Sequence, residues 1–133
     1  MDRSEARAAA MKLVYEREMG GEGGEETVSG MLNIVPGEAE FDYAQKICDG
    51  VALRLAEIDS VIERHLQNWS MERISRVDLA ILRVGVYEML TKSAPVFAVK
   101  SEAVRLANEF STDKSGAFVN GVLGAIEREE ARA

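Results

Sequence analysis

The stretch ISRVDLAILRVGVYEML, at residues 74–90, decides the fold that this sequence predicts. Its apolar side chains recur at helical spacing along two stripes: Ile74, Val77, Ile81 and Val84 on one, and Leu79, Leu82, Val86 and Met89 on the other. A helix that is apolar on most sides needs neighbours on most sides, so we expect a buried central helix here. Its charged residues Asp78, Arg83 and Glu88 are then either paired ions inside the protein or a small surface presented to a partner.

The composition is typical of one globular domain. The chain has 133 residues, of which 47% are hydrophobic and 29% are charged, and this length is enough to bury a core without disulfides or metal. No apolar run approaches the roughly 20 residues that span a bilayer, and the first residues do not resemble a signal peptide. We therefore expect no membrane association and a cytoplasmic protein, which agrees with the single cysteine.

The net charge of −7 argues against a nucleic-acid partner at first sight, because phosphate binding depends on basic surface. Its distribution weakens that argument. Residues 20–45 contain six acidic residues and no Lys or Arg, so this segment accounts for six of the seven net negative charges. The nearly neutral remainder has room for a local basic patch, with weak and salt-dependent binding.

Helical spacing also appears outside the central stretch. It predicts helices at about residues 3–19, 38–67 and 97–110, and another from Phe118 onward, with a short one at 26–34. The glycine-rich loop at residues 20–24 ends the first helix. No internal repeat and no strand-like alternation is present. The predicted architecture is all-α, with about six or seven helices.

Signatures of catalysis are missing from the sequence: it has no phosphate-binding loop, zinc pattern or nucleophile elbow. Cys48 and His65 could form a nucleophile and base, but on one continuous helix they lie about 25 Å apart. We expect Cys48 to be a core thiol and His65 a surface or helix-end residue. The sequence therefore favours a binding module over an enzyme, with no cofactor and no metal site.

Four segments, in this order, resemble the NusB family of bacterial transcription antitermination factors. They are RAAAMKLVY at 7–15, ISRVDLAILRVGVYE at 74–88, SEAVRLA at 101–107 and FVNGVL at 118–123. The resemblance spans nearly the whole chain. It implies a single RNA-binding domain over residues 1–133, made of two small adjoining bundles at about 1–69 and 70–133.

The resemblance also implies partners. In the family, the protein binds single-stranded boxA RNA jointly with NusE, a ribosomal protein of the small subunit. The assembly joins an RNA polymerase antitermination complex, notably on ribosomal RNA operons, and no reaction is catalysed. Some family members pair with themselves, so a homodimer is an alternative that the sequence leaves open.

Under this resemblance, six residues are the candidates for RNA contact: Arg3, Arg7, Arg83, Lys114, Phe118 and Asn120. The family begins its first helix with several arginines, whereas this chain keeps two, and this difference should weaken phosphate attraction. Lys114 stands in a loop where the family often has an acidic residue, so it could compensate for lost arginines. Arg83 is alternatively an internal ion-pair partner. Phe118 either stacks on a base or packs in the core, and Asn120 either contacts RNA or caps a helix.

For NusE, the matching positions are Tyr15, Glu72, Arg73 and Asp78. The alternative for these is a tyrosine at the rim of the core and solvated charges. Lys100 and Ser101 differ from the Ile-Asn pair that is usual in the family, which leaves the adjoining surface in question.

Two other functions remain as alternatives. One is a protein-interaction module of the same fold with little RNA affinity, which the acidic balance and the reduced number of arginines suggest. The other is an accessory RNA-binding domain of a ribosomal RNA methyltransferase. We disfavour the second, because the sequence has no room for a βαβ cofactor domain.

Overall fold

The computed structural model describes residues 3–20, 39–67 and 70–132, and these ranges contain helices and no strand. The elements are α1 (Arg3–Glu18), α3 (Ala39–Leu53), α4 (Leu55–Arg64), the 3-10 turn η1 (Met71–Arg73), α5 (Arg76–Thr91), α6 (Val96–Phe110) and α7 (Ser115–Arg132). The all-α prediction is confirmed. The helix predicted at residues 26–34 lies outside the described residues.

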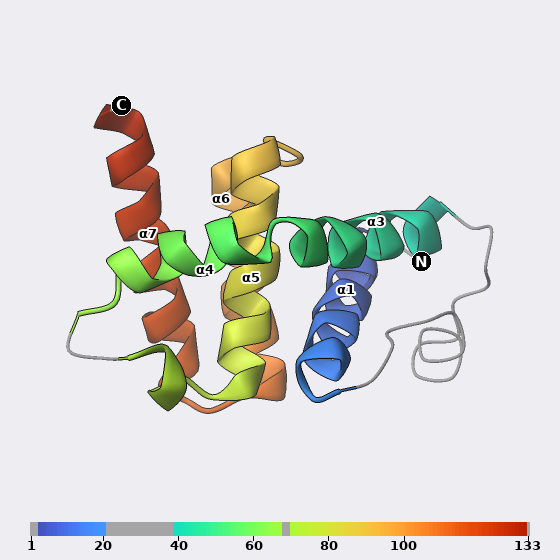
Figure 1. Cartoon of the computed structure of the whole chain (residues 1–133), viewed down its shortest axis with the longest axis horizontal. Helices are drawn as coiled ribbons and strands as arrows, with labels where there is room; N and C mark the ends of the chain where they lie inside the picture. Colours follow the sequence, from blue (N-terminus) through green and yellow to red (C-terminus); the bar gives the residue numbers. More distant parts are fainter. Residues whose placement is uncertain (1–2, 21–38, 68–69, 133) are drawn as a thin grey trace.

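Helix α5 is the centre of the molecule, as its sequence predicts. It contacts α1, α3, α4, α6 and α7, and every residue from Asp78 to Glu88 is buried. In Figure 1 it stands between α1 and α7. The helix starts at Arg76 because the Ser75 hydroxyl accepts a hydrogen bond from the Asp78 backbone N–H at 3.0 Å. It ends at Thr91, and the following residue, Lys92, caps it in the left-handed conformation with a φ of 54°.

The prediction of one continuous helix over residues 38–67 is wrong. Arg54, with φ −111° and ψ 19°, separates α3 from α4. Helix α3 packs on α1 and α5, whereas α4 turns to pack on α5 and α7. The apolar spacing continues through the joint without a glycine or proline there, so periodicity alone cannot reveal the break. Leu53, which is 88% exposed, is the local sign that the buried face changes.

The helices lie in two adjoining groups (Figure 1). Helices α1 and α3 pack together against α5, and α5, α6 and α7 form the second group. Helix α4 crosses in front of α5 and α7, so part of the chain before residue 69 packs on the second group. The exact boundary between the bundles stays a prediction. None of the helices in the described ranges is long and apolar enough to cross a membrane.

Gly50 on α3 allows the closest approach between α3 and α5. A Cβ atom at this position would lie 2.2 Å from Cε1 of the Tyr87 ring, closer than carbon atoms can approach. The lack of a side chain at Gly50 therefore lets the Tyr87 ring pack directly against α3.

Candidate functional site

Three of the four charged residues of α5, Asp78, Arg83 and Glu88, are buried, and each has a different partner. Glu88 is 1% exposed. Its carboxylate accepts hydrogen bonds from Nε of Arg7 at 3.0 and 3.1 Å and from the Tyr43 hydroxyl at 2.5 Å. Burial lowers the pKa of Arg7, but the hydrogen bonds and charge of Glu88 outweigh that effect and raise it. The Arg7 guanidinium is thus committed to an internal ion pair.

Arg83 makes a second internal network. Its Nε and Nη2 donate to the two carboxylate oxygens of Asp59 at 2.9 and 2.8 Å, and Nη1 donates to Glu18 at 3.0 Å. The hydrogen bond from Arg83 is the largest cause of a lowered pKa for Glu18. Only 8% of the Arg83 side chain is exposed. Arg83 is therefore an internal ion-pair partner, the second of the two roles considered for it, and little of its side chain is exposed to contact RNA.

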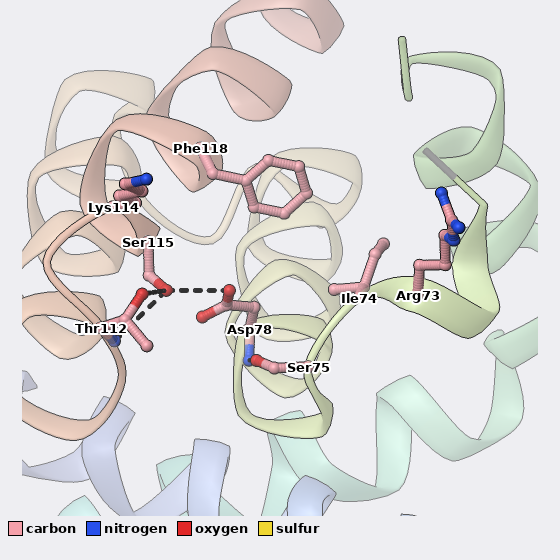
Figure 2. Close-up of a pocket in the computed structure, with 8 residues that line it drawn as sticks. All are labelled: Arg73, Ile74, Ser75, Asp78, Thr112, Lys114, Ser115 and Phe118. Atoms are coloured by element: carbon pink, nitrogen blue, oxygen red, sulfur yellow. Dashed lines mark hydrogen bonds between the residues drawn. The ribbon is translucent and has the colours of Figure 1, made fainter. Parts of the chain in front are cut away.

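Asp78 lies in a pocket of about 300 Å³ between η1, the start of α5 and the start of α7. Its Oδ2 accepts a hydrogen bond from the Ser115 hydroxyl at 2.9 Å, and the Ser115 oxygen lies 3.0 Å from the Thr112 hydroxyl. Figure 2 shows this chain from Thr112 to Asp78, with the Phe118 ring extending from α7 toward the side of Ile74. The Asp78 Oδ1 atom is buried and has no hydrogen-bond partner.

This pocket, which we call the Asp78 pocket, joins the two sets of residues that the family resemblance implied. Arg73 and Asp78 come from the set expected to contact NusE, and Lys114 and Phe118 come from the set expected near RNA. The sequence placed them about 40 residues apart and did not predict that they share one pocket. Both sets therefore meet where η1 and α5 face the start of α7.

The remaining residues expected to contact NusE lie beside this pocket or on α1. Glu72 and Arg73 are exposed on η1, and Tyr15 is half-buried on α1. Arg76 connects η1 to α1. It donates to Glu18 of α1 at 3.1 Å and to the carbonyl oxygens of Met71 and Ile74 at 2.8 and 2.7 Å. Arg76 was not among the residues expected from the sequence, because two of its acceptors are backbone carbonyl oxygens, which no residue pattern indicates.

The other residues expected near RNA differ in exposure. Arg3, Lys114 and Asn120 are exposed, whereas Phe118 is half-buried and packs against the core. The Arg3 guanidinium lies 3.7 Å from the centroid of the Tyr43 ring. Arg7, in contrast, is 7% exposed. Arg3 and Lys114 are thus the two cations of this set that reach the surface.

Two further cations, Arg105 and Lys12, lie between Arg3 and Lys114 where α1 contacts α6. The sequence did not indicate them. Arg105 donates to the Ser4 carbonyl oxygen at 3.0 Å, and the Ser4 hydroxyl donates to Glu102 at 2.6 Å. The Lys12 ammonium lies 4.6 Å from the centroid of the Phe110 ring. We call Arg105 and Lys12 the α1–α6 seam. Only the packing of the two helices brings them together, so no spacing in the sequence indicated them.

Cys48 and His65 have the structural roles expected of them. Cys48 is 1% exposed, and burial raises the pKa of its thiol to about 11. His65 follows the last residue of α4, with Nδ1 2.7 Å from the Val61 carbonyl oxygen. Its Nε2 contacts the carboxylate of Glu129 on α7, a partner that the sequence did not suggest. Within residues 3–20, 39–67 and 70–132, no three His, Cys, Asp or Glu side chains are grouped to hold a metal.

The fold and its buried central helix define the class: an all-helical protein with six α-helices among its described residues, arranged in two adjoining groups. Residues 4–128 match the sequence model of the family described as "NusB family". The chain therefore belongs to the NusB family.

Individual relatives agree with this assignment. The transcription antitermination protein NusB of Thermoanaerobacter sp. (strain X514) is 38% identical over 135 residues, which cover 98% of this chain and 93% of the relative. That of Acetivibrio thermocellus is 39% identical over 128 residues, covering 95% and 88%.

Solved structures agree as well. The antitermination factors NusB and NusE in complex with double-stranded RNA include a chain 34% identical to this one, with a TM-score of 0.85 and 96% of each chain covered. NusB of T. maritima is 32% identical with a TM-score of 0.83, covering 97% of this chain and 92% of its own.

Proposed function

We propose that this protein is a transcription antitermination factor that binds boxA-type single-stranded RNA together with NusE. It would act in the RNA polymerase antitermination complex on ribosomal RNA operons, in the cytoplasm, as a binding protein and not as an enzyme. Support comes from relatives named transcription antitermination proteins and from the similarity to a chain in the complex of NusB, NusE and RNA.

One observation carries the protein-binding half of this proposal: Arg73 and Asp78, both expected to contact NusE, line one pocket of about 300 Å³. The pocket also offers apolar walls at Ile74 and Phe118 and a cation at Arg73. We propose that a side chain of NusE enters this pocket, with Glu72 and Tyr15 extending the contact.

The RNA-binding half rests on the exposed members of the other set. Arg3, Lys114 and Asn120 would contact the RNA. Of the α1–α6 seam, Lys12 would add a cation between Arg3 and Lys114, because Arg105 is paired with Glu102 at 2.9 Å and with Glu109 at 3.1 Å. Phe118, which is half-buried and packs against the core, would border this surface. Arg7 and Arg83 would act indirectly, by holding α1 and α4 on α5 through their ion pairs.

The test is fluorescence anisotropy with a labelled boxA RNA, with this protein alone, NusE alone and the two together. We expect the pair to bind at least tenfold more tightly than either protein alone. Asp78→Asn should weaken association with NusE, whereas Asp49→Asn, which alters an exposed carboxylate on α3, should not. The absence of any gain from the pair at low salt would contradict the proposal.

The second candidate function is a protein-interaction module of the same fold with little RNA affinity. The net charge of −7 and the burial of Arg7 favour it. Under this function, the protein would bind NusE normally, and Arg3→Gln and Lys114→Gln would leave RNA binding by the pair unchanged. A loss of RNA affinity in these two variants, with NusE binding intact, would favour the first function.

A further inference from the structure

A second pocket, of about 400 Å³, lies between the first turn of α1, the middle of α3 and the C-terminal end of α5. We call it the Lys46 pocket. Its lining residues are two cations, two tyrosines, two hydroxyl side chains and one isoleucine: Arg3, Lys46, Tyr43, Tyr87, Thr91, Ser93 and Ile47. Of these, the sequence analysis identified only Arg3. In Figure 1, α3 crosses α1 on the side where both contact α5.

The charge of the Lys46 pocket is positive. Two cations and no acidic residue line it. Beneath the pocket, the Glu88 carboxylate accepts a hydrogen bond from the Tyr43 hydroxyl at 2.5 Å. Glu88 is already paired with Arg7 at 3.0 Å, so its charge does not neutralise Arg3 or Lys46. The pocket is therefore suited to an anion.

The buried network also positions Arg3. Tyr43 is held by its hydrogen bond to Glu88, and the Arg3 guanidinium lies 3.7 Å from the centroid of the Tyr43 ring. A cation–π contact of this kind orients the guanidinium plane and leaves N–H groups at its edge to bind an oxyanion. Lys46 is exposed and adds a mobile ammonium from the neighbouring helix. A planar arginine and a flexible lysine are a suitable pair for phosphate oxygens.

We propose that the Lys46 pocket is an additional phosphate-binding subsite, occupied by a phosphodiester of the single-stranded RNA strand. The proposal rests on the RNA-binding function proposed above. Arg3 belongs both to this pocket and to the expected RNA surface, so a strand bound at the start of α1 needs only to continue toward α3. The same chemistry would accept a free phosphate, and the test separates these two sources.

The first experiment measures RNA binding by the complete protein with NusE at several salt concentrations. Lys46→Gln should weaken binding about three- to tenfold at low salt. It should also reduce the slope of log K against log salt by about 0.7, the value for one phosphate of a single strand. Lys46→Arg, which keeps the charge, should bind like the unmodified protein. The matched control is Arg54→Gln, which removes one exposed charge outside the pocket.

Two outcomes would overturn the subsite. One is equal RNA binding by Lys46→Gln and Arg54→Gln. The other combines two results: inorganic phosphate shifts the NMR signals of the Lys46 and Thr91 amides, but Lys46→Gln binds RNA with unchanged affinity. The pocket would then bind free phosphate and not the RNA strand. Failure of the unmodified pair to bind RNA at all would instead overturn the proposed function. Because Lys46 is exposed, thermal unfolding of Lys46→Gln should match that of the unmodified protein and exclude a folding defect.

Discussion

Arg7 and Glu88 form an ion pair in the interior, with the arginine Nε 3.0 and 3.1 Å from the two carboxylate oxygens. The pair joins α1 to α5, and the Tyr43 hydroxyl adds α3 at the same carboxylate. Three helices therefore meet at one buried charge. Arg3 lies one turn earlier on α1 and is exposed, whereas Arg7 is buried.

Replacing Arg7 with Met should destabilise the fold strongly. The substitution leaves the Glu88 charge buried without a cation, which typically costs about 3–5 kcal/mol. Urea unfolding measures this loss, and Arg54→Met, at an exposed and weakly paired position, is the control. A variant that lost RNA affinity but kept its free energy of unfolding would instead identify Arg7 as a direct RNA contact.

Acidification should destabilise the protein partly through Glu18. The hydrogen bond from Arg83 is the first cause of its lowered pKa in the folded state. Glu18 therefore contributes stability above its unfolded pKa of about 4.5, and this contribution is lost as the pH falls through the lower folded value.

The measurement is the free energy of unfolding between pH 7 and pH 3. Glu18→Gln should show a smaller loss over the acid range than the unmodified protein. Glu63→Gln, at an exposed position of α4, is the comparison. Equal acid sensitivity of Glu18→Gln and the unmodified protein would disprove this role.

Gly50→Ala should separate α3 from α5. The added methyl would lie 2.2 Å from Cε1 and 2.4 Å from Cζ of Tyr87, so one helix or the ring must move. Overpacking of this kind costs about 1–3 kcal/mol. The same substitution in a Tyr87→Ala background should cost much less, because the clashing ring is absent. Additive effects of the two substitutions would contradict the proposed contact. Gly121→Ala, with open space around its position, is the control.

Local patterns predicted the helices well, because amphipathic spacing is a property of neighbouring residues. They identified α5 as the buried centre and gave α1 and α6 nearly correct bounds, whereas α7 begins at Ser115, before the predicted start at Phe118, and continues to Arg132. They failed at Arg54, where the apolar spacing remains in phase while the chain turns toward α7. Such a turn depends on what α4 packs against, and that information is not local.

The candidate site was less predictable for the same reason. The sequence showed that Asp78, Arg83 and Glu88 had to be either paired or presented, but their partners come from other helices. Arg7, Asp59 and Ser115 become partners only after the helices pack. The family resemblance named most of the relevant residues, whereas the structure separated those that reach the surface from those held inside.

Ser115→Ala tests whether the Asp78 pocket is prepared for a partner. Ser115 donates the hydrogen bond that holds Oδ2 of Asp78 at 2.9 Å, while Oδ1 remains without a partner. Removing the hydroxyl leaves both oxygens unpaired in a buried position, which should lower the free energy of unfolding by about 1–3 kcal/mol. It should also weaken NusE binding, because the carboxylate loses its fixed orientation.

Ser101→Ala, at an exposed position of α6, is the control and should change neither the free energy of unfolding nor NusE binding. Binding of NusE should raise the free energy of unfolding of the unmodified protein. If NusE raises the free energy of unfolding of Ser115→Ala by the same amount, then the orientation of Asp78 does not contribute to the interface.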